Sequence, residues 1–201
     1  MTYTYNNKGT CSVRTVVELN DDHTIKSVQV LGGCDGNLKG IAKLLPGMKA
    51  EDAIARITAP YSRKNGPSPF ANRREIQETN WVNVGVVRKQ SGLEKALVDF
   101  ASLRQDVERA SVSGNRAYNM EFNTHLDTLN MIDVSVMAAV SALQREETRG
   151  AHTREDFPNQ RDDYGLFNTF LWKGGDGMPV FEKKDVVFKH KSLEACQKHK
   201  K

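Results

Sequence analysis

The stretch ETRGAHTREDFPNQRDD, residues 147–163, gathers the side chains of this sequence that are best suited to bind charge or to move protons. From residue 145 to residue 163 there are four arginines, six acidic residues and no lysine. The planar guanidinium of arginine pairs with carboxylates through two parallel hydrogen bonds, and it tolerates partial burial better than an ammonium group does. We therefore expect this segment to be docked against protein rather than to be a solvated loop.

Three interpretations of this segment are open: it docks against helices of its own chain, it docks against another domain or subunit, or it takes part in catalysis. For the second interpretation, the candidate interdomain or partner-docking residues are Arg149, His152, Arg154, Asp156, Arg161, Asp162 and Asp163. The sequence has no HxH or HExxH pair, GxSxG turn or catalytic-cysteine signature. It therefore predicts no catalytic residue and no self-contained active site.

Cys11 and Cys34 are the candidates for a metal site or a thiol pair, because one opens a predicted strand and the other follows the next strand. Two cysteines without a CxxC motif provide only half of a zinc site. Buried thiols are the favoured interpretation, and we expect no metal centre.

The glycine-rich run GGCDGNLKG, residues 32–40, invites comparison with a nucleotide-binding loop. It lacks the GxGxxG spacing and the Gly-Lys-Ser/Thr ending of a P-loop. Its glycines are expected to supply positive φ angles between a strand and a helix, with an anion at the helix N-terminus as the alternative.

Composition indicates a globular protein of one or two domains, with 201 residues of which 38% are hydrophobic and 27% charged. No signal peptide and no uninterrupted apolar run of about 20 residues is evident, so we expect no direct membrane insertion. The three cysteines are few and odd in number, which indicates a reducing compartment. The expected location is cytoplasmic.

The net charge of +4 resides in the C-terminal tail. From Lys183 onward there are seven lysines and two acidic residues, so the tail contributes +5 and the rest of the chain −1. A solvated basic tail over residues 189–201 is the favoured interpretation. Since no aromatic residues alternate with these lysines, we predict no nucleic-acid partner.

Hydrophobic patterning divides the chain into two segments. CSVRTVVEL and TIKSVQVL alternate like the strands of a β-hairpin, and LKGIAKLL and AEDAIARI resemble short helices, which predicts a ββαα module over residues 1–59. Residues 60–70 are rich in proline, glycine and serine and are predicted to be a linker.

Residues 71–188 change to a helical period. Three helices are predicted at REIQETNWVNVGVV, at SGLEKALVDFASLRQDVERA and at NTHLDTLNMIDVSVMAAVSALQREE, the last with Asn123 or Thr124 as N-cap and Gly150 just after its end. LFNTFLWK and MPVFEKKDVVF then flank a KGGDG turn. The predicted fold is α+β: a small ββαα module followed by a three-helix bundle with a C-terminal loop and β-hairpin.

Four segments resemble, in order, the C-terminal helical domain of the flavoprotein subunit of succinate dehydrogenase and fumarate reductase: REIQETNWVNVGVVRKQSGLEKAL, FNTHLDTLNMIDV, ETRGAHTREDFPNQRDD and FNTFLWKGGDGMPVFE. The resemblance covers about residues 65–188. In that family FAD lies in a domain opened by GxGxxG, and a capping domain closes over the dicarboxylate. These 201 residues resemble neither domain, so the resemblance implies FAD in a partner and none bound by this chain alone.

KGTCSVRTVVEL and VLGGCDGNLKGIAKLLPGM resemble the TSCPD-type domain, over about residues 5–57. That domain occurs alone in bacteria and at the C-terminus of some cobalamin-dependent ribonucleotide reductases. The closing GGKPTSCPDQL run of the family is absent, and Pro60–Phe70 in its place has no cysteine. The resemblance therefore implies a truncated domain, in which Cys11 and Cys34 lack a third thiol.

Together the resemblances imply an accessory or partial flavoprotein subunit of fumarate reductase or succinate dehydrogenase type. Its expected partner is a FAD-bearing flavoprotein domain or subunit, with an iron–sulfur subunit as a further partner and a location peripheral to the membrane through such a complex. One alternative is a TSCPD-type binding or regulatory module linked to ribonucleotide reductase or nucleotide binding. Another is a folded relic of a gene fusion. The sequence leaves open whether the protein takes part in an enzymatic reaction.

Overall fold

The computed structural model describes residues 1–9, 12–33, 42, 45–116, 119–175 and 178–189. The chain forms two compact units, an N-terminal unit, Met1–Ser62, and a C-terminal unit, Arg63–Lys201. Cys11, Cys34, most of the helix expected at LKGIAKLL and the tail beyond residue 189 lie outside the described residues.

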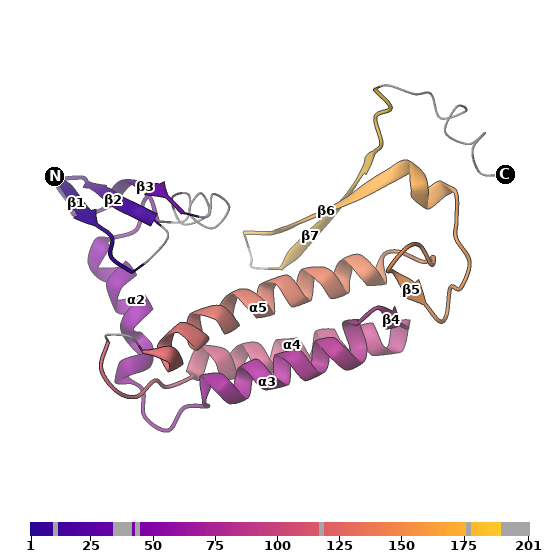
Figure 1. Ribbon diagram of the computed structural model, residues 1–201, viewed down its shortest axis with the longest axis horizontal. Coiled ribbons are helices and arrows are strands. Elements are labelled where there is room, and N and C mark those ends of the chain that lie inside the picture. The colour runs from indigo at the N-terminus through magenta and orange to yellow at the C-terminus, as the bar shows by residue number, and fades with distance from the viewer. Residues whose placement is uncertain (10–11, 34–41, 43–44, 117–118, 176–177, 190–201) are drawn as a thin grey trace. The chain divides into compact units, whose positions relative to one another are not determined.

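The N-terminal unit contains an antiparallel sheet of strand order β1-β2-β3 and the helix α2 (Figure 1). The elements are β1 (Thr2–Asn6), β2 (Ser12–Leu19), β3 (Ile25–Gly32) and α2 (Ala50–Ser62). Ile25, Val28 and Ala53 form its buried core. The predicted hairpin is confirmed as β2 and β3, with Val17 opposite Val28. The sheet has one strand more than predicted. Strand β1 was not predicted, because its alternation of threonine and tyrosine is exposed and contains no aliphatic residue.

The segment predicted as a linker is shorter than expected and is packed against its own unit. Helix α2 continues to Ser62 and α3 begins at Pro69, which leaves residues 63–68 between them. The Arg63 guanidinium donates to the carbonyl of Ala110 at 3.1 Å. A Cβ at Gly66 would lie 2.3 Å from the carbonyl oxygen of Arg109, so only glycine allows this close approach.

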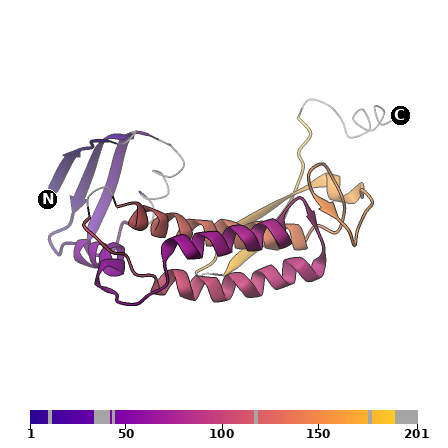
Figure 2. The ribbon, with the colours of Figure 1, turned by 60° about the horizontal axis from the view of Figure 1, so that its bottom comes forward.

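Three helices of the C-terminal unit lie side by side and form its core (Figures 1 and 2). They are α3 (Pro69–Thr79), α4 (Gln90–Arg109) and α5 (Met120–Leu143). Their shared core contains Ile76, Val84, Leu93, Ala96, Phe100, Leu103, Val107, Ile132, Ala139 and Ala142. This arrangement confirms the predicted three-helix bundle, since the apolar stripe of α4 faces its two neighbours.

The start of α5 differs from the prediction. The side chain of Asn119, rather than of Asn123 or Thr124, accepts from the backbone N–H of Phe122 at 3.0 Å and caps the helix. The helix ends at Leu143, so Gly150 is not its terminating glycine. Gly150 instead takes a φ of +59° in a later turn.

A π-helical turn, η1 (Asn80–Val84), interrupts the first predicted helix after Thr79. Its end at Gly85 is tight, because a Cβ there would lie 2.8 Å from the carbonyl oxygen of Trp81. Strand β4 (Val87–Arg88) follows and pairs in parallel with β5 (Thr153–Arg154). The arginine-rich loop is therefore tied by backbone hydrogen bonds to the segment between α3 and α4.

The C-terminal hairpin is formed by β6 (Phe167–Lys173) and β7 (Pro179–Asp185), preceded by the 3-10 turn η2 (Asp163–Leu166). One face of the hairpin packs toward α5, where the Ser141 and Thr169 hydroxyls lie 3.3 Å apart. The opposite face exposes Phe170, Trp172 and Val180. The hairpin and the α+β class are as predicted.

Helix α5 is long and apolar enough to cross a membrane, judged by length and composition alone. Its sequence contains no uninterrupted apolar run, so the sequence alone did not indicate this. In the C-terminal unit α5 packs against α3 and α4, and the hairpin contacts it as well. Of its apolar 18-residue window, 28% is buried by these neighbours.

Candidate partner-docking site

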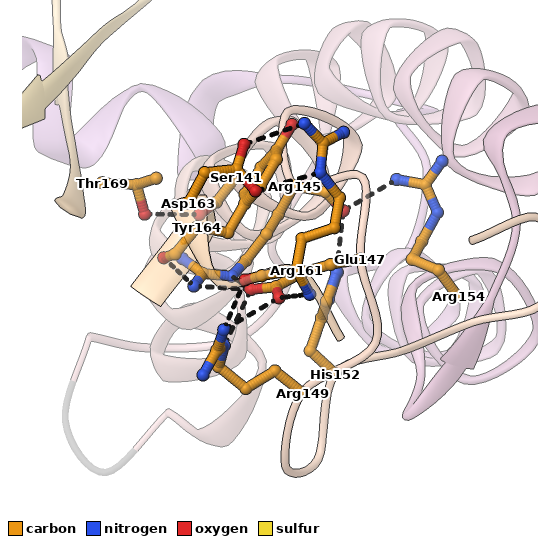
Figure 3. A network of polar contacts seen from close by, with 10 residues as sticks. All are labelled: Ser141, Arg145, Glu147, Arg149, His152, Arg154, Arg161, Asp163, Tyr164 and Thr169. Atoms are coloured by element: carbon orange, nitrogen blue, oxygen red, sulfur yellow. Dashed lines mark hydrogen bonds and ion pairs between the residues drawn. The ribbon is translucent and has the colours of Figure 1, made fainter. Parts of the chain in front are cut away.

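A buried carboxylate, Glu147, lies at the centre of the arginine-rich loop (Figure 3). Its Oε1 accepts from Arg145 Nε at 2.9 Å and from Arg149 Nε at 2.8 Å. Its Oε2 accepts from Arg149 Nη2 at 3.0 Å and from the backbone N–H of Arg161 at 2.9 Å. Burial alone would raise the pKa of Glu147, but these hydrogen bonds outweigh it and the pKa is lowered. Glu147 is thus an ionised, fully paired hub.

We call the set Arg145, Glu147, Arg149, His152, Arg154, Asp156, Arg161 and Asp163 the arginine network. Arg154 is its most buried cation, with 1% of the residue exposed. Its Nη1 donates to the carbonyl of Ala142 at 2.9 Å and to that of Leu143 at 3.3 Å. These carbonyls are at the C-terminus of α5, where a positive charge is favoured by the helix dipole.

Asp156 connects Arg154 to a second helix. Arg154 Nε and Nη2 donate to its two oxygens at 2.7 and 2.8 Å. Asp156 Oδ2 also accepts from the backbone N–H of Gln90, the first residue of α4, at 2.8 Å. The hydrogen bonds from Arg154, together with that from Gln90, hold the pKa of Asp156 far below its usual range. The pair thereby joins the end of α5 to the beginning of α4.

His152 lies in a tight turn that closes on itself. The backbone N–H groups of Arg149 and His152 each donate to the carbonyl of the other residue, at 2.8 and 3.0 Å, around Gly150. His152 Nε2 lies 3.0 Å from the carbonyl of Arg145 and must donate to it. Burial is the largest cause that lowers the pKa of His152, and neighbouring arginines, among them Arg88, add to it. His152 is therefore neutral near pH 7.

The outer part of the network is exposed to solvent. Arg161 pairs with Asp163 through Nε at 3.2 Å and Nη2 at 2.8 Å, and its guanidinium lies 4.6 Å from the centre of the Tyr164 ring. Arg149 Nη2 also donates to the Arg161 carbonyl at 2.7 Å. Asp162 contributes to raising the pKa of Arg149, after the larger effect of Glu147.

The loop places all seven predicted docking residues in one place, but it divides them by role. Arg154 is buried, and it and the more exposed Asp156 are hydrogen-bonded to each other and to the helices α5 and α4. Arg161, Asp162 and Asp163 face solvent. Docking of the loop against its own helices is thus what the geometry shows. In the part of the chain that the structure describes, no three His, Cys, Asp or Glu side chains are grouped to hold a metal.

Sequence reasoning missed the centre of the network and its apolar neighbour. Arg145 and Glu147 were not among the predicted docking residues, although Glu147 stands two positions from an arginine on either side. The neighbouring surface, which we call the apolar rim, comprises Trp81, Val82, Val86 and Val87. Trp81 is 85% exposed and the three valines are each more than half exposed. Tryptophan and valine are normally taken as core residues, so no signal marked them.

The apolar rim adjoins the arginine network through the backbone. The carbonyl of Val86 accepts from the N–H of Thr153 at 3.1 Å, between His152 and Arg154. On its other side Trp81 and Val82 line an open groove with Val84, Gly85 and Ala138. Trp81 and Val82 therefore lie at the groove, and Val86 lies beside the arginine-rich loop.

A bundle of three helices, an arginine-rich loop and a hairpin define the class of this unit. The chain belongs to the fumarate reductase flavoprotein C-terminal family, whose model matches residues 73–199, more than half of the sequence. The TSCPD domain model matches residues 1–72, which extends beyond the 5–57 expected. Both predicted resemblances are confirmed.

Individual relatives agree with this assignment. The fumarate reductase flavoprotein subunit of Mycobacterium tuberculosis is 34% identical over 106 residues, which are 52% of this chain and 18% of that protein. The succinate dehydrogenase flavoprotein subunit of Coxiella burnetii is 31% identical over 124 residues, 61% of this chain and 21% of that protein. The aligned part of this chain therefore spans about a fifth of the length of these relatives.

Solved structures show the same fold. A chain of the apo Sdh1 complex of Mycobacterium smegmatis superposes with a TM-score of 0.68 and 25% identity, over 81% of this chain and 30% of that chain. A quinol-fumarate reductase with menaquinol molecules gives a TM-score of 0.65 at 20% identity, over 80% of this chain and 27% of that chain.

Proposed function

We propose that this chain supplies the C-terminal domain of a fumarate reductase or succinate dehydrogenase type flavoprotein to a separate FAD-bearing partner. The family match over residues 73–199 and the coverage of only about a fifth of each relative support this proposal. FAD and the dicarboxylate would belong to the partner. An iron–sulfur subunit of the same complex is a further proposed partner.

The exposure of the apolar rim is the observation that carries the proposal. Four large apolar side chains within seven consecutive residues are exposed, and exposed apolar groups of this kind are typical of protein interfaces. Trp81, at 85% exposure, is of the residue type that most often anchors such interfaces. Binding would bury the side chains of the apolar rim against the partner. Their burial would add the hydrophobic stabilisation that is missing while they are exposed.

The arginine network has a positioning role in this proposal. A loop that is already fixed by Glu147, Arg154 and Asp156 loses little conformational freedom on binding, which lowers the entropic cost of association. The exposed Arg161, Asp162 and Asp163 would form the polar border that surrounds the apolar centre of an interface.

Co-purification tests the proposal. The full chain, carrying an affinity tag, is expressed in its own host, and the co-purified protein is identified by mass spectrometry and assayed for flavin. We expect a chain with a GxGxxG dinucleotide-binding domain at about equal molar amount. Val82→Ser should reduce its recovery, whereas Val98→Ser, on the exposed face of α4, should not; the two valines are 70% and 71% exposed. Recovery of the wild type without a flavoprotein would contradict the proposal.

A second candidate function rests on the TSCPD match over residues 1–72. The N-terminal unit would then bind a nucleotide, as a regulatory module linked to ribonucleotide reductase. A ligand at a hundred times its dissociation constant adds about 2.7 kcal/mol to stability. Thermal unfolding of the full chain with and without each nucleotide tests this, and the absence of a shift with any of them counts against it.

A further inference from the structure

Arg88, in strand β4, has a guanidinium that is not paired with any carboxylate of the described residues. Arg88 is half-buried. Its Nε is shielded from solvent and has no hydrogen-bond partner. Buried donors are nearly always paired in folded proteins, so an open one requires a physical explanation. Within the described residues, the Arg88 side chain makes no ion pair.

The arginines around it differ in this respect. Arg145 and Arg149 pair with Glu147, at 2.7 and 2.8 Å. Arg154 pairs with Asp156 at 2.7 Å, and Arg161 pairs with Asp163 at 2.8 Å. Arg88 is thus the exception in a region where arginine is otherwise matched to carboxylate.

Neither of the two carboxylates nearest the centre of the network is hydrogen-bonded to Arg88. Glu147 accepts four hydrogen bonds, from Arg145, from Arg149 and from the backbone of Arg161. Asp156 accepts three, two from Arg154 and one from the backbone of Gln90. Both carboxylates thus serve other donors.

The surroundings of Arg88 are positively charged. Burial lowers the pKa of Arg88, and the charge of Arg154, its partner in the β4–β5 pair, lowers it further. Six acidic residues accompany the four arginines of residues 145–163, and no ion pair of these carboxylates in the described part of the chain includes Arg88. A single carboxylate would pair with Arg88.

Arg88 follows directly on the apolar rim. Val86 and Val87 precede it in the chain and are 59% and 55% exposed. A group that reached Arg88 from outside would approach across the surface proposed to contact the flavoprotein. The anchors of protein interfaces are commonly charge pairs beside apolar contacts, shielded from water by the surrounding residues.

We infer that Arg88 receives the carboxylate of an aspartate or glutamate of the FAD-bearing partner, which pairs the Arg88 guanidinium across the interface. This inference rests on the proposed function. A protein side chain fits better than a phosphate, because the unpaired charge of Arg88 is a single unit and a phosphate group carries between one and two at neutral pH. The guanidinium offers the carboxylate a paired set of donors.

The experiment compares full-length variants for binding to the flavoprotein that co-purifies with the wild type. Arg88→Met should raise the Kd about 30-fold or more, because removal of one partner of a shielded charge pair mainly speeds dissociation. Arg109→Met removes the same charge from the far end of α4, about 30 Å along the helix. This control should bind like the wild type.

Measurements on the isolated chain make the test independent of the partner. If Arg88 has no partner within its own chain, Arg88→Met should unfold in urea at the same or a higher concentration than the wild type. A lower midpoint would assign Arg88 to internal packing and overturn the inference. Stabilisation by free succinate of the wild type but not of Arg88→Met would assign the site to a small dicarboxylate and overturn it too.

The outcomes separate the inference from the proposed function. If the wild type binds the flavoprotein and Arg88→Met binds equally well, the inference is wrong and the proposed function stands. If the wild type recruits no flavoprotein, both are wrong. If Arg88 pairs with an acidic residue of the partner, replacing that residue with glutamine should restore part of the binding that Arg88→Met loses, because it removes the carboxylate left unpaired. If no replacement of an acidic residue of the partner restores binding to Arg88→Met, the pairing is contradicted.

Discussion

Arg154 and Asp156 form a two-point ion pair, with N···O distances of 2.7 and 2.8 Å, that joins the C-terminus of one core helix to the N-terminus of another. Arg154 also binds the last carbonyls of α5, and Asp156 binds the first N–H of α4. Two residues separated by one position thereby hold together the C-terminus of α5 and the N-terminus of α4, in the part of the helical core near which the partner is proposed to bind.

The first prediction concerns this pair. Arg154→Met should lower the free energy of unfolding of the C-terminal unit by about 3 kcal/mol, because it strands Asp156 and the α5 carbonyls without their donor. Arg161→Met, which removes an exposed arginine from the same loop, should change stability little. Urea unfolding can be followed by fluorescence, since both tryptophans, Trp81 and Trp172, lie in this unit. Equal effects of the two substitutions would contradict the central role of Arg154.

The second prediction concerns acid. The pKa values of Asp156 and Glu147 are lowered in the folded chain relative to about 4 in the unfolded chain. Their contribution to stability is therefore fully present above about pH 4 and is lost as the pH falls through the folded-state values. Urea midpoints measured between pH 6 and pH 2 should fall steeply below about pH 4. Glu147→Gln should be less stable at neutral pH and should show a shallower decline.

The third prediction concerns two histidines. His125 is buried in α5 with an unpaired Nδ1, and burial, followed by the charge of Arg63, lowers its pKa. The pKa of His152 is lowered as well. Their neutral forms stabilise the fold above about pH 6.5, and this contribution declines as the pH falls through that value. NMR titration of the imidazole ring resonances should give a midpoint below pH 6.5 for both histidines. The variants His125→Gln and His152→Gln assign the two resonances. Titration of either at or above that value would contradict the burial seen here.

The fourth prediction concerns residues 63–68, between helices α2 and α3. Gly66→Ala should destabilise the C-terminal unit by about 1–3 kcal/mol, because its Cβ would meet the carbonyl of Arg109 at 2.3 Å. Gly175→Ala is the matched control, since no atom lies within 4 Å of its Cβ position. Equal unfolding midpoints for the two variants would show that residues 63–68 behave as the free linker that their composition predicts.

Elements whose pattern repeats along the chain were predictable. The stripe of α4 at Leu93, Phe100, Leu103 and Val107 is visible in the sequence, and each of these residues is buried. The buried face of α5 was harder to predict from the sequence. Its most buried positions include Thr128, Ser135 and Ala139 rather than the leucines beside them. Small residues let helices approach closely. Hydropathy alone does not distinguish a buried face made of small residues from an exposed polar face.

Features that depend on contacts between distant segments were not predictable in the same way. The cap of α5 is Asn119 because this side chain also donates to the carbonyls of Ser113 and Asn115, which fixes it at the helix start. The arginine-rich composition predicted docking but not Glu147 as its hub. The π-helical turn that exposes Trp81 has no sequence signature, and the open donor of Arg88 appears only once its neighbours are placed.

In the proposed function, flavin reaches this chain only through a partner. The FAD content of the full chain purified alone, compared with that of the complex recovered from its host, tests this directly. We expect no stoichiometric flavin absorbance for the chain alone and about one FAD per chain in the complex. One FAD bound by the isolated chain, or a complex that contains none, would contradict it.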